Sequence, residues 1–104
     1  MRQEQLLNYL GKSCRGRTNR VSGRKLEQML GIGKSQLQKQ VNQLRQQGYP
    51  IGSDEHGYYY AINAGEVCAT AVRLRKMARG LELAAMGIER SLDHFTWRDG
   101  ASHG

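Results

Sequence analysis

The feature that most constrains this chain is an apolar repeat with a seven-residue period in its last third. Steps of four and three residues alternate there, which is the spacing of a coiled-coil seam along one face of a helix. Asn63 stands where an N-cap is expected, and Glu66 follows three residues later, as in a capping box. Residues 64–95 are therefore predicted to form one long helix. Its seam residues are Val67, Ala71, Leu74, Ala78, Leu81, Ala85, Ile88, Leu92 and Phe95.

Such a helix would be about 48 Å long at 1.5 Å per residue, more than a small neighbouring domain covers. Because an isolated helix with so much apolar surface would aggregate, we predict a homodimer that pairs through this helix, in either orientation. One alternative is a helix folded back on its own domain. Another is a helix lying on a membrane, which the nearly balanced charges after residue 63 disfavour. Residues 96–104 are predicted to be a flexible tail, from which Trp97 could reach the partner helix.

Most of the positive charge lies before this helix. The chain has 16 Lys and Arg against 9 Asp and Glu, and residues 1–63 hold ten of these basic residues but only four of the acidic ones. A surplus of this size predicts a polyanionic partner, either nucleic acid or an anionic membrane. No apolar run approaches the roughly 20 residues of a membrane span. The N-terminus lacks the apolar segment of a secretion signal, so we expect a cytoplasmic protein in which Cys14 and Cys68 are free thiols.

Residues 1–63 contain three short segments with helical spacing. Leu6, Leu7 and Leu10 predict a first helix that ends at Gly11, and residues 12–20 are predicted to be a basic loop. Ser22 is the expected N-cap of a second helix, in which Leu26, Met29 and Leu30 follow at helical spacing. Glycines at positions 31 and 33 break this helix after about two turns.

The third helix is predicted over residues 34–47, because Leu37, Val41 and Leu44 recur at helical spacing and Gly48 stands in the C′ position. Tyrosine-rich apolar runs then flank residues 52–57, a Gly/Asp/Ser-containing segment. This pattern predicts a β-hairpin with residues 52–57 as its turn.

Helix, helix, glycine turn, helix and hairpin is the order of elements in a winged helix-turn-helix domain. The resemblance is carried by VSGRKLEQMLGIGKSQLQKQVNQLRQQGYPI over residues 21–51 and by GYYY from Gly57. Over about the first 60 residues, the chain resembles the N-terminal DNA-binding domain of biotin operon repressors. The resemblance implies a mainly α fold with a small β-hairpin wing, here followed by a long dimerisation helix. The biotin-ligase domain of bifunctional relatives is not matched, so we expect no biotin binding and no cofactor.

The resemblance also implies that the third helix enters the major groove of double-stranded DNA. With its apolar residues turned inward, its opposite face presents amides that can bond adenine edges and lysines that can reach phosphate or guanine. These candidate readers are Lys34, Ser35, Gln36, Gln38, Lys39, Asn42 and Gln43, with Gln46 further along the same face. The alternative for any single glutamine is a helix former that keeps the face soluble.

Basic residues before the third helix are candidate phosphate contacts. Arg20, Arg24 and Lys25 lie near the start of the second helix, where contacts to phosphate would not depend on sequence. Arg17 lies in the basic loop, which either contacts phosphate or the minor groove or is merely solvated. Asp54 and Glu55 at the hairpin tip would be repelled by phosphate, so the hairpin tyrosines are expected to pack inward.

These features predict a sequence-specific, dimeric DNA-binding protein, most simply a transcriptional repressor or other regulator. The alternative is a DNA-binding adaptor for the replication or assembly of a mobile element, which would recruit a second protein through the long helix. Residues 31–35 resemble the end of a phosphate-binding loop, but Gln28 occupies the position of its first glycine. No acid–base or nucleophile pattern supports an enzyme, and the three histidines lack the spacing of a metal site.

Overall fold

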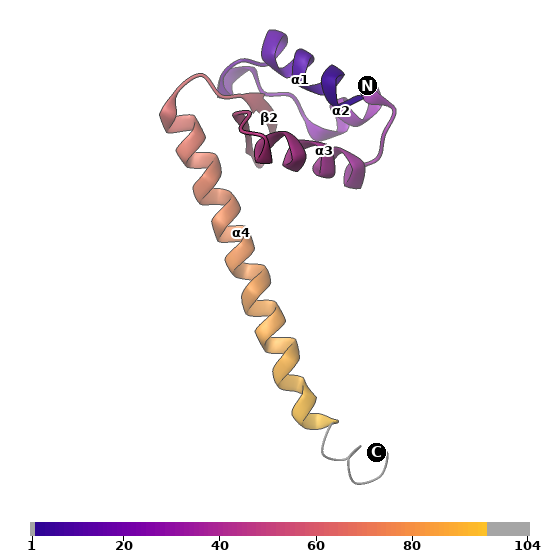
Figure 1. Ribbon diagram of the computed structural model, residues 1–104, viewed down its shortest axis with the longest axis vertical. Helices are drawn as coiled ribbons and strands as arrows, with labels where there is room; N and C mark the ends of the chain where they lie inside the picture. The colour runs from indigo at the N-terminus through magenta and orange to yellow at the C-terminus, as the bar shows by residue number, and fades with distance from the viewer. Residues whose placement is uncertain (1, 96–104) are drawn as a thin grey trace. The chain divides into compact units, whose positions relative to one another are not determined.

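The structure is a computed structural model, and it describes residues 2–95. The chain is mainly helical, with one small antiparallel hairpin (Figure 1). It divides into two compact units, Met1–Ala71 and Val72–Gly104, so the first two turns of the long helix belong to the first unit. The elements are α1 (Arg2–Ser13), a 3-10 turn (Arg17–Asn19), α2 (Gly23–Leu30), α3 (Lys34–Gln46), β1 (Ile51–Asp54), β2 (Gly57–Tyr60), α4 (Ala64–Arg90) and a 3-10 turn (Ser91–His94).

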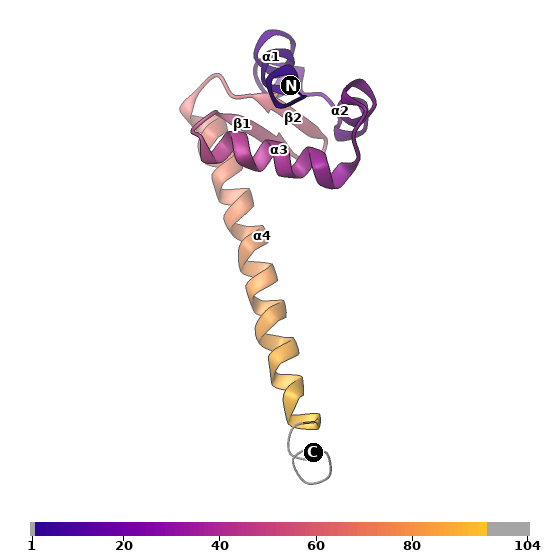
Figure 2. The same cartoon turned by 45° about the vertical axis from the view of Figure 1, so that its right-hand side comes forward.

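The first unit is built around a core that its three short helices and its hairpin share (Figure 2). Each leucine side chain that is buried in this core contributes about 1.5–3 kcal/mol of stability, which holds the short elements together. The predicted stripe of α3 is confirmed as its buried face. The main core side chains are Leu6 and Leu10 of α1, Leu26 of α2, Leu37, Val41 and Leu44 of α3, Ile51 of β1 and Tyr59 of β2.

Met29 has the helical spacing of Leu26 and Leu30, but its side chain is exposed. Leu26 is fully buried and Leu30 packs against the core, so these two residues mark the inward direction of α2. At about 100° per helical residue, Met29 lies about 60° from Leu26 and about 100° from Leu30, which places it to one side of that direction.

The predicted helix ends of α2 and α3 are confirmed. The Ser22 side chain accepts a hydrogen bond from the Lys25 N–H at 3.1 Å, which caps the start of α2. Gly31 ends α2 in the left-handed conformation, with φ at 65°. At the end of α3, Gly48 has φ of 99°, its N–H bonds the Arg45 carbonyl, and the Tyr49 N–H bonds the Leu44 carbonyl. This pair of bonds is a Schellman motif.

The hairpin is tighter than predicted. Asp54 pairs with Gly57, so only Glu55 and His56 form the turn, and the prediction of a turn over residues 52–57 is wrong. Gly52 lies inside β1, and the ring of Tyr59 packs over its Cα. A glycine fits this position because a Cβ would overlap the ring. The expected inward packing of the tyrosines is confirmed, since Tyr59 is buried and Tyr58 and Tyr60 pack against the core.

The segment between α1 and α2 is also more regular than the predicted loop. α1 continues through Gly11 to Ser13, where the ring of Tyr60 lies 3.9 Å from the position that a Gly11 Cβ would occupy. The chain then pairs twice with β2, at Arg15 with Tyr60 and at Val21 with Tyr58. Long-range pairing, which local composition does not reveal, makes this segment part of the hairpin's edge.

The start of α4 confirms the predicted cap in part. The Asn63 side chain accepts a hydrogen bond from the Glu66 N–H at 2.8 Å. The Glu66 carboxylate, however, accepts from the Ile62 N–H at 2.9 Å instead of completing the capping box at Asn63. One turn later, the hydroxyl of the buried Thr70 accepts a hydrogen bond from the Ser53 N–H of β1 at 3.2 Å, which fixes this part of α4 to the hairpin.

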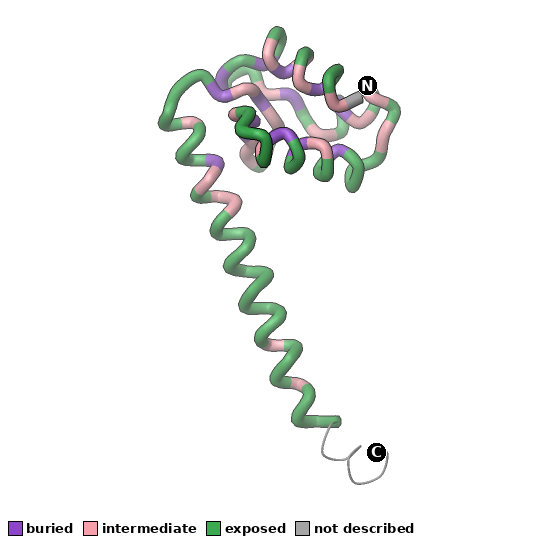
Figure 3. Tube along the Cα trace, viewed as in Figure 1, coloured by how far each residue is buried: buried purple, intermediate pink, exposed green. Residues whose placement is uncertain are grey.

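The predicted helix over residues 64–95 is shorter in the structure. The α-helix ends at Arg90 and a 3-10 turn follows, so Leu92 and Phe95 lie beyond regular α-helix. Most of residues 72–95 are exposed (Figure 3). Among the large seam residues, Leu81 is 73% and Ile88 70% accessible, while Leu74 is half-buried. No helix within residues 2–95 combines the length and the apolar character that crossing a bilayer requires. The predicted flexible tail, with Trp97, lies outside the described residues.

Candidate nucleic-acid interface

The α3 helix separates an apolar face from a polar one, as predicted. Leu37, Val41 and Leu44 are each at most 2% exposed. The opposite face is open to solvent, and buried and exposed positions alternate along α3 in Figure 3. The structure thus brings the candidate readers together on one surface of the first unit. Its exposed members are Lys34, Ser35, Gln36, Gln38, Lys39, Asn42, Gln43 and Gln46.

The polar face of α3 is largely free to meet a partner. Its N-cap, Gly33, has no side chain that could cap the first backbone N–H groups of α3. Gln43 is different, because its Oε1 accepts a hydrogen bond from Nε2 of Gln3 in α1 at 3.1 Å. Pattern reading along α3 could not identify this contact, since the two residues are forty positions apart. Gln3 therefore orients one of the candidate readers.

Arg24 and Lys25 lie in the first turn of α2 with exposed side chains. Their position follows from the Ser22 cap, which uses the backbone N–H of Lys25 and leaves both cationic side chains in solvent. The turn of residues 31–33 joins α2 directly to α3. The structure thus places these two candidate phosphate contacts on the helix that precedes the polar face.

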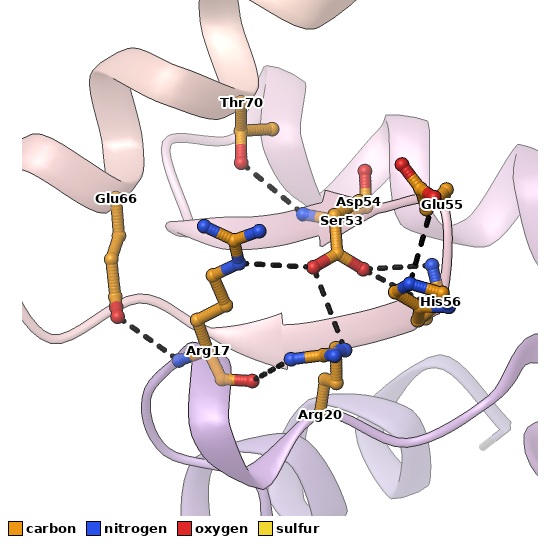
Figure 4. A network of polar contacts seen from close by, with 9 residues as sticks. Arg17, Arg20, Ser53, Asp54, Glu55, His56, Glu66 and Thr70 are labelled. Atoms are coloured by element: carbon orange, nitrogen blue, oxygen red, sulfur yellow. Dashed lines mark hydrogen bonds and ion pairs between the residues drawn. The ribbon is translucent and has the colours of Figure 1, made fainter.

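Arg17 and Arg20 are placed differently, around the carboxylate of Asp54 (Figure 4). Arg17 Nε donates a hydrogen bond to Asp54 Oδ2 at 3.1 Å, and Arg20 Nε lies 3.5 Å from the same oxygen. Arg20 Nη1 also donates to the Arg17 carbonyl at 3.0 Å. The Arg17 side chain is still 62% exposed. These two arginines therefore stabilise the hairpin in the unbound chain, while the Arg17 side chain stays accessible to a partner.

Asp54 is not a free negative charge at the hairpin tip. Its side chain is only 15% exposed, and Oδ1 accepts hydrogen bonds from the N–H groups of His56 at 2.8 Å and Gly57 at 3.2 Å. Burial by itself would raise the pKa of Asp54. The His56 hydrogen bond, the Arg17 hydrogen bond and the charge of Arg20 outweigh burial and lower this pKa below its usual value. The expectation that Asp54 repels phosphate is thus weakened, and only Glu55 presents an exposed carboxylate there.

Glu66 joins the same network from the start of α4. Its Oε2 accepts a hydrogen bond from the Arg17 N–H at 3.0 Å, and its Oε1 accepts from the Ile62 N–H. These two bonds, with Arg17 the larger cause, lower the pKa of Glu66 below its usual value.

The lowered pKa values predict acid sensitivity of the first unit. A carboxylate whose pKa is lower in the folded state adds stability above its unfolded pKa, and that stability is lost as the pH falls through the folded value. The unfolded reference values are 3.8 for Asp54 and 4.5 for Glu66. We therefore expect the free energy of unfolding to fall below about pH 4.5. Urea titrations between neutral and acidic pH measure it.

Asp54→Asn tests the origin of this sensitivity. Asn keeps an oxygen for the turn but loses the arginine pairs, so we expect a loss of about 1 kcal/mol at neutral pH and a flatter acid dependence. Glu55→Gln removes an exposed carboxylate from the adjacent position and is the matched control. Equal acid dependence in the parent and the Asp54→Asn variant would contradict the role of Asp54.

The contacts of two further basic residues were not predicted from the sequence. Arg45, near the end of α3, donates from Nε to the Ile51 carbonyl at 2.8 Å and from Nη2 to the Ser53 hydroxyl at 2.9 Å. The guanidinium of Arg15 lies 5.5 Å from the centre of the Tyr60 ring. Both basic residues count toward the surplus charge of residues 1–63, yet both have structural contacts.

The residues described by the structure include no group of three or more His, Cys, Asp or Glu side chains that could hold a metal ion. Cys14 is buried and Cys68 is exposed, and both are free thiols, as expected. Burial raises the pKa of Cys14. Comparisons with protein-family models, curated proteins and solved structures found no match to this chain.

Proposed function

We propose that this chain is a sequence-specific double-stranded DNA-binding protein whose first unit is a winged helix-turn-helix domain. The observation that carries the proposal is the exposed amide-and-lysine face of α3, opposite a stripe buried in the core. Asn and Gln side chains match the donor and acceptor pattern of adenine in the major groove, and lysines contact guanine or phosphate. A helix attached to its domain by one face presents the other face to a groove about 12 Å wide.

The charge distribution supports this use of α3. Arg24 and Lys25 on the preceding helix supply exposed cations of the kind that contacts phosphate. Arg17 and Arg20 hold Asp54 at the hairpin, which reduces the negative charge that a phosphate backbone would meet there. Binding of this kind becomes weaker as salt rises, because counterions are released from the DNA on association.

The exposed seam of α4 supports a homodimer. Leu81 and Ile88 present a row of large apolar side chains that a second copy of the helix would bury. Two copies bind two half-sites, which is how a dimeric transcriptional regulator, most simply a repressor, recognises a two-fold operator.

A second candidate function is a DNA-binding adaptor for the replication or assembly of a mobile element. The observation that favours it is a set of apolar side chains outside the seam, namely Val72, Met77, Leu83 and Met86, all of which are exposed. A partner helix on the seam would leave part of this set uncovered, and a different protein could bind it.

Selection from randomised duplex DNA with the purified chain tests the proposal. An enriched palindromic sequence would support a two-fold regulator. An enriched site without symmetry would favour the adaptor, and no enrichment would contradict sequence-specific binding.

On a selected site, we expect Lys39→Ala and Asn42→Ala each to weaken binding by about 1–3 kcal/mol, because each removes a contact to the DNA bases. Fluorescence anisotropy at a fixed salt concentration measures the affinity. Lys12→Ala removes another exposed lysine, from α1, and is the matched control. The double variant Arg24→Ala, Lys25→Ala should weaken binding to all sequences alike. Full affinity in both α3 variants would contradict the placement of α3 in the groove.

A further inference from the structure

The charges of α4 divide along its length. Basic residues occupy the first part after the boundary between the two units, and acidic residues predominate in the later part. The basic residues are Arg73, Arg75, Lys76 and Arg79. The later charged residues are Glu82, Glu89 and Arg90, with Asp93 in the 3-10 turn that follows. Two copies side by side in the same direction would place the basic block against itself, whereas opposite directions place each basic block beside the acidic part of the other copy.

The seam itself alternates in size. Large residues, Leu74, Leu81 and Ile88, occupy one of its two rows. Small residues, Ala71, Ala78 and Ala85, occupy the other. In antiparallel pairs of helices, the two rows face each other, so each large side chain meets a small one. Parallel pairing would place large residues against large ones and leave alanine against alanine.

We propose that two copies of the chain pair through α4 in antiparallel orientation, with the two-fold axis between Arg79 and Gly80. This inference rests on the homodimer of the proposed function and specifies its geometry. In this register, Ala71 faces Ile88 of the second copy, Ala78 faces Leu81, and Ala85 faces Leu74. By symmetry the three contacts occur twice, so six layers of one large and one small side chain fill the seam between residues 71 and 88.

The flanking charges fit the same register. Arg75 and Glu82 occupy equivalent positions beside the seam, one heptad apart, and the two-fold axis brings Arg75 of one copy beside Glu82 of the other. This ion pair also occurs twice. Within its own chain, Glu82 Oε1 lies 3.4 Å from Arg79 Nη1, and both side chains are about two-thirds exposed. A carboxylate has two acceptor oxygens, so Glu82 has a second oxygen for Arg75 of the other copy.

Charge reversal in the full-length chain tests the orientation. Arg75→Glu and Glu82→Arg each turn two attractive contacts into repulsive ones, so each variant should dimerise roughly tenfold more weakly in low salt. The double variant Arg75→Glu, Glu82→Arg exchanges the charges and should restore the parent's dimer dissociation constant. Analytical ultracentrifugation measures these constants. Recovery in the double variant supports antiparallel pairing, since parallel helices do not bring the two positions together. A dimeric parent without recovery overturns this register but keeps the dimer, and a monomeric parent overturns both.

Disulfide cross-linking gives a second measurement that does not depend on charge. Cys68 is exposed and is first replaced by serine, while the buried Cys14 is kept. In this background, Ala71→Cys and Ile88→Cys chains of different mass are mixed in a glutathione redox buffer. Antiparallel pairing predicts that the disulfide between the two different chains predominates, because residue 71 faces residue 88. Disulfides that join identical chains at equilibrium would show parallel helices and overturn the proposal. DNA binding by the first unit is measured separately, so failure of either test leaves that result intact.

Discussion

Gly57→Ala is expected to destabilise the first unit by roughly 3–5 kcal/mol, which is a large share of the total free energy of unfolding of a domain of this size. A Cβ at this position would overlap the Val21 carbonyl group, and Gly57 has φ of 157°, where a side chain is strained. The Val21 carbonyl cannot move away without cost, because it accepts a hydrogen bond from the Tyr58 N–H at 2.8 Å. Alanine therefore separates the edge of the hairpin from the segment before α2.

Urea unfolding, followed by near-ultraviolet circular dichroism of the tyrosines, measures this loss. Gly80→Ala is the matched control, because the position is inside α4 and, apart from the adjacent residues and the helix's own backbone, no described atom lies within 4 Å of the added carbon. We expect this control to leave the first unit unchanged and to favour the helix by about 0.5–1 kcal/mol. An unaltered unfolding midpoint in Gly57→Ala would show that the contact with Val21 is not as tight as the structure has it.

Leu81→Glu is expected to raise the dimer dissociation constant at least about 100-fold, because pairing would bury a carboxylate at the centre of the seam. The chain should then be monomeric at micromolar concentration, and its affinity for a two-fold operator should fall by a similar factor since only one half-site is engaged at a time. Light scattering measures the mass, and anisotropy on the selected DNA measures the affinity.

Leu83→Glu is the control for this variant. Leu83 is a leucine of the same helix that is also exposed, but it lies outside the seam. The Leu83→Glu chain should remain dimeric and keep the parent's affinity for the operator. DNA with a single half-site should bind the Leu81→Glu and Leu83→Glu chains equally. If Leu83→Glu dissociates the dimer and Leu81→Glu does not, the second copy binds a different face of α4.

Local signals predicted the helices because each of them acts over a few residues. The stripe of Leu37, Val41 and Leu44 requires only helical periodicity, and the cap at Ser22 only a side chain next to a free N–H. Gly48 ends α3 because its left-handed conformation closes the last turn. The polar face of α3 follows directly from the stripe, so the exposed surface of the candidate site could be predicted as well.

Contacts between distant segments could not be predicted. Gly11 resembles a helix end in sequence, but α1 continues through it to Ser13, and the ring of the distant Tyr60 lies beside it. Asp54 resembles an exposed turn residue, but Arg17 and Arg20 bind it from more than thirty positions away. Such pairings depend on how the hairpin docks on the segment before α2, and no local pattern encodes that docking.

The carboxylate of Glu66 has a mechanical consequence. It accepts hydrogen bonds from Ile62 at the entrance to α4 and from the backbone of Arg17, 49 residues earlier in the chain. The side chain of Arg17 in turn holds Asp54. These hydrogen bonds connect the first turn of α4 to the 3-10 turn that precedes α2. A force that unwinds the start of α4 is therefore transmitted to that 3-10 turn.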